Sequence, residues 1–179
     1  MSIRLGTLRP RDRDSVAELL VSTAVFSPEE IGVALQLFDA SVRDEGAAGA
    51  EDAHVADYEF TGAFDGDRLL GYACAGPTPA TEGTFDLYWL AVDAAAQGRG
   101  IGTSLVREVE RGLRHRGARM LLVETSSRPD YSNTRAFYAR CGYTEAARIR
   151  DFYAPADDRI MLITRLSGTI TRERGAATR

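Results

Sequence analysis

The chain has 179 residues, of which 44% are hydrophobic and 27% are charged, values typical of one globular domain. Its formal net charge is −4 at pH 7, so neither nucleic acid nor an anionic membrane surface is an expected partner. The longest uncharged run, Leu69 to Thr81, has 13 residues and is too short to span a membrane. The N-terminus shows no apolar segment typical of a secretory signal.

Residue usage excludes several catalytic chemistries. All 22 basic residues are arginine, so neither a Walker A phosphate loop nor a lysine Schiff base to pyridoxal phosphate can form. Cys74 and Cys141 lie far apart with no CxxC motif, which indicates a reducing, cytoplasmic location. His54 and His115 have no metal-ligand spacing to each other or to the cysteines, so no metal is expected.

The first part of the chain predicts one strand and two helices. Residues 2–8 have the pattern of a short strand, and Asp12 or Asp14 can cap the helix that follows. Ser27, followed by proline and two glutamates, is a typical helix start. Residues 45–57 are small, polar and acidic, which predicts a mobile loop. The apolar stripe of the second helix is expected at Ile31, Leu35, Phe38 and Val42.

Three strands are predicted next. Residues 58–64 and 69–75 flank Asp65-Gly66-Asp67, which is a hairpin signal. The run Gly76-Pro77-Thr78-Pro79 is expected to end the second of these strands. Residues 84–92 are rich in aromatic and apolar side chains and predict a third strand.

Helices and strands alternate after this point. A helix is expected to end near His115, and the apolar run 120–125 is typical of a central strand. A short helix is expected to begin at Ser132 or Asn133 and to stop at Gly142.

A hairpin and a tail complete the chain. Residues 145–153 and 159–165 are expected to pair, and the polar residues 171–179 to fray. The resulting order is β-α-α-β-β-β-α-β-α-β-β, which predicts an α/β fold with a mixed sheet and helices on its faces.

The sharpest motif is Gln97-Gly98-Arg99-Gly100-Ile101-Gly102, between a predicted strand and a predicted helix. Glycines let backbone N–H groups turn inward, and the helix N-terminus adds partial positive charge, so the motif suits a pyrophosphate. Two other interpretations stay open. One is a tight turn without a ligand. The other is a dinucleotide-binding Rossmann loop. In that loop the third glycine comes one residue later than Gly102, and the acidic residue that follows lies at a strand end, whereas Glu124 lies within a predicted strand.

Two segments together carry a resemblance to a known family. Gln97-x-x-Gly100-x-Gly102, five residues after the strand end Leu90-Ala91-Val92, resembles the acetyl-CoA loop of the GNAT superfamily of N-acetyltransferases. The run from Asn133 to Tyr138, followed by Cys141-Gly142-Tyr143, resembles the segment after the family's fifth strand. Cys141 departs from the aliphatic residue usual there. The resemblance extends over about residues 2–166, including the order of elements.

The resemblance implies a GNAT fold, with a central twisted mixed sheet of about seven strands and about four helices on its faces. The domain would span residues 1–166, and 167–179 would form a polar tail. Strands 84–92 and 120–125 would splay apart, with the pantetheine arm of acetyl-CoA between them and its pyrophosphate on the glycine loop. The donor-binding residues that the resemblance implies are Leu90, Ala91, Val92, Gln97, Gly98, Arg99, Gly100, Ile101, Gly102, Thr103 and Asn133.

The resemblance also assigns candidate catalytic roles. Asp86 lies five residues before Ala91, where part of the family has a carboxylate that helps to deprotonate the amine. Its alternative is a polar residue that holds a water molecule or a neighbouring strand. Tyr138 matches the tyrosine that protonates the leaving thiolate, and its alternative is an aromatic residue packed on the sheet. The substrate candidates are Glu29, Glu30, Tyr88 and Glu124. For the first two, acids that stabilise a helix N-terminus are the favoured alternative.

The implied function is transfer of the acetyl group of acetyl-CoA to a primary amine, by direct attack in a ternary complex and without a metal. The acceptor would be a small molecule, an amino acid or a peptide, and the acidic balance of the chain favours a cationic one. One alternative is transfer of a longer acyl group. Another is a non-catalytic acyl-CoA-binding or regulatory module. Whether the chain forms a homodimer stays open.

Overall fold

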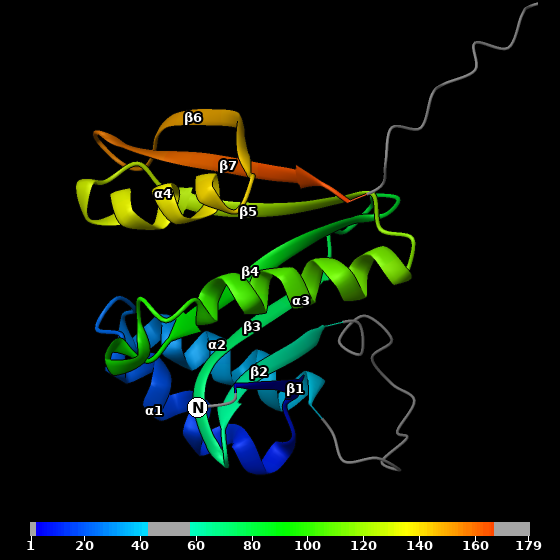
Figure 1. Ribbon diagram of the computed structural model, residues 1–179. Helices are drawn as coiled ribbons and strands as arrows, with labels where there is room; N and C mark the ends of the chain where they lie inside the picture. Colours follow the sequence, from blue (N-terminus) through cyan, green and yellow to red (C-terminus); the bar gives the residue numbers. More distant parts are fainter. Residues whose placement is uncertain (1–2, 43–57, 167–179) are drawn as a thin grey trace, which may run out of the picture.

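A computed structural model of the protein describes residues 3–42 and 58–166. Within these residues seven strands form one sheet in the order β1-β2-β3-β4-β5-β7-β6, and four α-helices pack on it (Figure 1). Only β4 and β5 run parallel, so the sheet is mixed. The predicted fold class is therefore confirmed. The predicted loop 45–57, with His54, and the predicted tail 167–179 lie outside the described residues.

The order of strands and helices agrees with the prediction, and three short 3-10 helices were not predicted. The strands are β1 (Arg4–Thr7), β2 (Glu59–Asp65), β3 (Arg68–Pro77), β4 (Thr84–Val92), β5 (Met120–Ser126), β6 (Thr144–Ala154) and β7 (Asp157–Arg165). The helices are α1 (Arg13–Ser22), α2 (Pro28–Ser41), α3 (Ile101–His115) and α4 (Ser132–Arg140), with 3-10 helices η1 (Pro10–Asp12), η2 (Ala94–Ala96) and η3 (Pro129–Tyr131).

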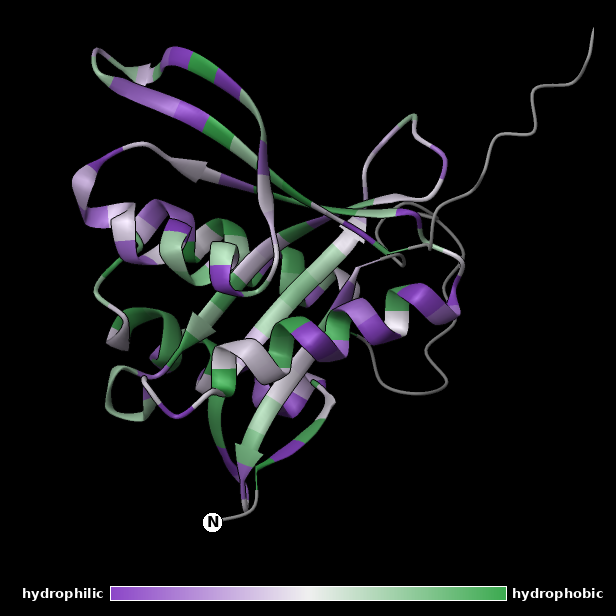
Figure 2. Ribbon diagram, turned by 45° about the horizontal axis from the view of Figure 1, so that its top comes forward, coloured by the Kyte–Doolittle hydropathy of each residue, from purple (hydrophilic) through white to green (hydrophobic). Residues whose placement is uncertain are grey.

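One face of the sheet is covered by α3 and α4. Ile101, Leu105 and Leu113 of α3 are almost fully buried, because their helical spacing puts them on one side of the helix. They belong to the same apolar cluster as Leu121 of β5 and Tyr138 of α4. Figure 2 shows the alternation of apolar and polar residues along α3. This cluster fixes the start of α3 against the sheet.

The opposite face of β1 to β4 is covered by α1 and α2. Phe38 of α2 packs edge-to-face on Phe60 of β2, with ring centroids 5.1 Å apart. The predicted start of α2 is confirmed, since the Ser27 side chain accepts a hydrogen bond from the Glu30 N–H and the Glu30 carboxylate accepts one from the Ser27 N–H. The prediction that Val42 extends the helix is wrong, because α2 ends at Ser41 and Val42 has extended backbone angles.

The strand predicted over residues 69–75 is longer than expected, although it ends within the predicted run Gly76-Pro77-Thr78-Pro79. β3 continues to Pro77, which lies opposite Phe85 of β4. The Thr78 N–H donates to the Thr84 carbonyl over 2.9 Å. Pro77 and Phe85 are therefore a non-hydrogen-bonded pair, and the Pro77 nitrogen points away from β4. The proline nitrogen faces the β2 side of β3. There the pairing with β2 stops at Ala75, which lies opposite Glu59, so the N–H that proline lacks removes no hydrogen bond of the sheet.

Gly71 of β3 gives a stability prediction, because a Cβ atom there would lie 2.8 Å from the Ala91 carbonyl and 3.2 Å from Leu105 of α3. We expect Gly71→Val to lower the free energy of unfolding by about 2 kcal/mol through overpacking. Gly112→Ala is the control, since its Cβ would meet nothing within 4 Å, and alanine in a helix stabilises by up to about 1 kcal/mol. Denaturant unfolding checks both. Equal stability of the valine variant and the wild type would contradict the close packing.

Candidate active site

The sheet opens between β4 and β5. The two strands pair only at their starts, where Thr84–Asp86 lies beside Met120–Leu122. Beyond these residues the strands diverge, and the gap separates the part with β5, β7, β6 and α4 from the rest (Figure 1). A cleft of about 1020 Å³ occupies this region, lined by the α1–α2 connection, β4, the start of α3, the end of β5 and α4. The splay that the resemblance implies is present.

The unpaired edge of β4 presents backbone groups to the cleft. The Asp93 N–H donates to the Leu70 carbonyl over 2.9 Å. Val92 and Gly71 are therefore a non-hydrogen-bonded pair of the antiparallel ladder, and the N–H and C=O groups of Val92 point away from β3. The peptide groups of Val92, and of Leu90 two residues earlier, therefore face the cleft. Ala91 has the opposite orientation: its peptide groups face β3 and its side chain is 3% exposed in the core under α1 and α2.

The loop between β4 and α3 forms an open backbone cradle. Gly98 and Gly100 have φ angles of +75° and +77°, which side-chain-bearing residues rarely adopt. A Cβ at either position would meet nothing within 4 Å. Gly100 is the N-cap of α3 and has no side chain to cap it. The N–H groups of Ile101, Gly102 and Thr103 therefore have no acceptor within the helix, whereas the Ser104 N–H donates to the Gly100 carbonyl over 3.0 Å. The Gln97 side-chain amide donates to the Val92 carbonyl over 3.4 Å. Such a cradle suits an anion.

Most predicted donor-binding residues line this one cleft. They are Leu90, Val92, Gln97, Gly98, Gly100, Ile101, Gly102, Thr103 and Asn133. Ala91 and Arg99 are not among the lining residues, and for Ala91 the cause is the strand register described above.

Asp86 lies at the point where β4 and β5 separate, and it lines the cleft. The Thr78 hydroxyl donates to its carboxylate over 2.5 Å. Partial burial raises the pKa of Asp86 above its usual range, the Thr78 hydrogen bond opposes this, and the nearby negative charge of Glu124 adds to it. A carboxylate with a raised pKa can accept a proton more readily at neutral pH.

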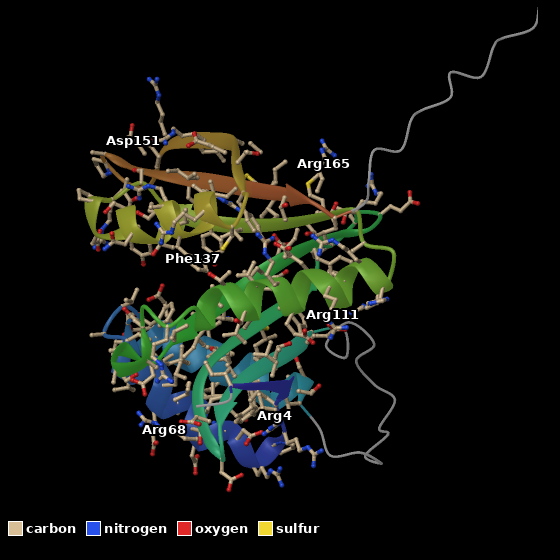
Figure 3. All side chains as sticks on the ribbon, in the orientation of Figure 1. Arg4, Arg68, Arg111, Phe137, Asp151 and Arg165 are labelled. Atoms are coloured by element: carbon tan, nitrogen blue, oxygen red, sulfur yellow. The ribbon has the colours of Figure 1, made fainter. Side chains whose placement is uncertain are left out.

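Tyr138 enters the cleft from α4 and is 5% exposed. Its ring lies edge-to-face on Phe137 and on Tyr143, with centroids 5.0 and 5.4 Å away. Burial raises the pKa of the Tyr138 phenol well above its usual value, so the hydroxyl is protonated at neutral pH. Figure 3 labels Phe137, which lies between α4 and α3; a Cβ on Gly102 would come within 3.3 Å of its ring.

The four substrate candidates differ in position. Glu30 lines the cleft, although one of its carboxylate oxygens caps α2, whereas Glu29 does not line it. Tyr88 lines the cleft and is 39% exposed. Glu124 also lines it, but its carboxylate already accepts a hydrogen bond from the Tyr153 hydroxyl over 2.5 Å and forms an ion pair with Arg159.

Several lining residues were not predicted as site residues. Phe26 packs on Trp89 of β4, with centroids 5.2 Å apart, and both line the cleft. Tyr131, Tyr153 and Asp157 line it as well. The last two belong to the β6–β7 hairpin, whose return along β5 no local sequence signal specifies. For Trp89 the sequence signal is its place in the aromatic run 84–92, which favours a position in the core or in a pocket wall.

Two further findings concern a metal site and a membrane-spanning helix. Within residues 3–42 and 58–166, no group of three or more His, Cys, Asp or Glu side chains could hold a metal ion. In the same residues, no helix has the length and apolar character needed to cross a bilayer.

Comparisons with known proteins complete the description. The model of the Acetyltransferase (GNAT) family matches residues 26–143. A GNAT-family crystal structure from Desulfovibrio desulfuricans is 40% identical, with a TM-score of 0.81, and covers 93% of this chain and 99% of that one. No match was found among curated proteins.

Two more distant structures share the fold. The Escherichia coli ribosomal-protein-S18-alanine N-acetyltransferase has a TM-score of 0.72 at 17% identity, covering 96% of this chain and 98% of that one. An aminoglycoside 6'-N-acetyltransferase complexed with coenzyme A has a TM-score of 0.70 at 15% identity, covering 93% and 98%.

Proposed function

The chain belongs to the GNAT family of acetyltransferases, and from this premise we propose that it transfers the acetyl group of acetyl-CoA to a primary amine in a ternary complex. The observation that carries the proposal is the convergence on one cleft of the glycine cradle, the unpaired edge of β4, Asp86 and Tyr138. The distant neighbours named above act on amines according to their names, which supports the choice of acceptor.

The cradle and the β4 edge fit an acyl-CoA donor. Open space above Gly98 and Gly100, together with the free N–H groups at the start of α3, suits the negatively charged pyrophosphate. The peptide groups of Leu90 and Val92 can pair with the amide groups of the pantetheine arm. An N–H group on this edge can also donate to the thioester oxygen as negative charge develops there.

The proposed reaction needs three proton transfers, two from nitrogen and one to sulfur. The acceptor is an ammonium ion at neutral pH, and Asp86, directly or through water, takes one proton from it. The amine nitrogen then forms a bond to the acetyl carbon as the carbon–sulfur bond breaks. Tyr138 donates its phenolic proton to the departing thiolate. The new amide nitrogen gives up its second proton to the resulting tyrosinate, directly or through water, so that the amide and the CoA thiol both leave neutral.

A screen of amine acceptors with acetyl-CoA, read by release of free thiol, tests the function. We expect turnover with at least one cationic primary amine. Donor binding without turnover on any amine would favour the non-catalytic module. A longer acyl-CoA that outperforms acetyl-CoA on the same acceptor would favour transfer of a longer acyl group.

Gly100→Asp tests the donor site. Asp and Asn tolerate a positive φ better than most residues, and either side chain enters open space at this position, so Gly100→Asn is a control that differs only in charge. We expect the aspartate variant to bind acetyl-CoA at least about tenfold more weakly than the asparagine variant, about 1.4 kcal/mol. Calorimetry measures both. Equal affinities of the two folded variants for acetyl-CoA would contradict the placement of the pyrophosphate on this loop.

We also propose a cytoplasmic location. Cys74 and Cys141 are both buried and free of disulfide bonds, which supports a reducing compartment.

A further inference from the structure

A buried carboxylate lines the cleft without a role in the proposed reaction. Asp157, the first residue of β7, is 8% exposed. Its carboxylate accepts a hydrogen bond from the Ser126 hydroxyl over 2.5 Å. Among residues 3–42 and 58–166 no basic side chain forms an ion pair with it, and Arg128, which is close enough to feel its charge, is paired with Asp130. A negative charge is thus largely removed from water without a counter-ion.

Such a charge costs free energy unless a cation accompanies it. The surroundings of Asp157 suit an ammonium group. Burial raises the pKa of Tyr131, and the negative charges of Glu30 and Asp157 raise it further. The charge of Asp157 also reaches Tyr153 of β6, where burial and Glu124 are the larger causes of a raised pKa. Tyr131, Tyr153, Glu30 and Asp157 all line the same cleft, and aromatic rings and carboxylates both attract cations.

This point is distinct from the place where the amine would react. Asp86 is level with Leu122 of β5, where the two strands still pair, whereas Asp157 is held by Ser126 at the other end of β5. Leu122 and Ser126 are four residues apart, which is about 13 Å at the usual rise of a strand. An acceptor that reaches both carboxylates must be extended and must carry charge at both ends.

We propose that the acceptor carries a second cationic group, and that Asp157 binds this group beside Tyr131 and Tyr153 while the reacting amine lies near Asp86. The substrate class is an extended diamine or polyamine. This inference rests on the proposed function for its reaction, but the second site binds a cation whether or not acetyl transfer follows.

The test compares α,ω-diamines of increasing chain length with monoamines of the same carbon number. With acetyl-CoA present, we expect kcat/KM to favour the diamines by at least about tenfold and to peak at one chain length. Asp157→Asn keeps the side-chain shape and an acceptor for Ser126, so it is expected to fold. It should lower the diamine-to-monoamine ratio at least about tenfold. Asp67→Asn removes one exposed charge in the turn between β2 and β3, outside the cleft lining, and should keep the ratio within about twofold.

Monoamines that react as well as diamines would overturn the proposal, as would a diamine preference that survives in folded Asp157→Asn. If no amine in any panel is acetylated, the proposed function fails. Calorimetry of the diamines with the protein alone then tests whether the second cation site exists. Binding that the Asp157→Asn variant loses supports it, and absence of binding to the wild type overturns it.

Discussion

Replacing Tyr138 with phenylalanine is expected to lower kcat about 100-fold on the true acceptor. General acid assistance is typically worth about 10²–10⁴ in rate, and a thiolate is already a fair leaving group, so the lower end is expected. The substitution removes only a hydroxyl group. The contacts of the ring with Phe137 and Tyr143 survive, so acetyl-CoA affinity should change by less than about twofold. Single-turnover kinetics and calorimetry separate the two effects.

Tyr143→Phe is the matched control. Tyr143 is also buried and touches Tyr138, but it is not among the residues that line the cleft. Loss of its hydroxyl should leave kcat within about twofold of wild type. Two tyrosine variants with equal rates, with chemistry shown to be rate-limiting, would assign Tyr138 to packing alone.

The fold was predictable wherever a local pattern decides the structure. The four-residue spacing from Ile101 to Leu113 specifies the buried face of α3, and Ser27 with Glu30 specifies the start of α2. The run that ends β3 was predictable, but its exact last residue was not, because the cost of Pro77 depends on which neighbour its nitrogen faces. That orientation follows from strand register, which the local sequence does not fix.

The candidate site divides in the same way. The glycine loop is a contiguous motif, so the sequence points to it directly. Tyr153 and Asp157 belong to the cleft only because β7 returns beside β5 and β6 folds back on β7. Glu124 appears in the sequence as a free acid, but in the structure Tyr153 and Arg159 already contact its carboxylate. Long-range pairing, rather than residue type, decides these roles.

Asp86→Asn is expected to lower kcat/KM about 100-fold near neutral pH, since general base assistance has a similar magnitude to general acid assistance. The asparagine keeps the side-chain shape and can still accept the hydrogen bond from Thr78, but it cannot take a proton. In the wild type, activity should fall as the pH falls through the pKa of Asp86. Burial raises this pKa above its usual range, so the acidic limb of the rate–pH profile should lie at a higher pH than for an exposed aspartate.

Thr78→Val separates a proton acceptor from a merely structural carboxylate. The Thr78 hydrogen bond lowers the pKa of Asp86, whereas burial and Glu124 raise it and Tyr88 and Arg159 lower it. Loss of the hydroxyl should therefore move the acidic limb to higher pH while activity on the alkaline side of that limb is largely retained. In Asp86→Asn the limb itself should disappear. An unchanged limb in the asparagine variant would assign the proton transfer to another group, with Asp86 retained only to join Thr78 to β4.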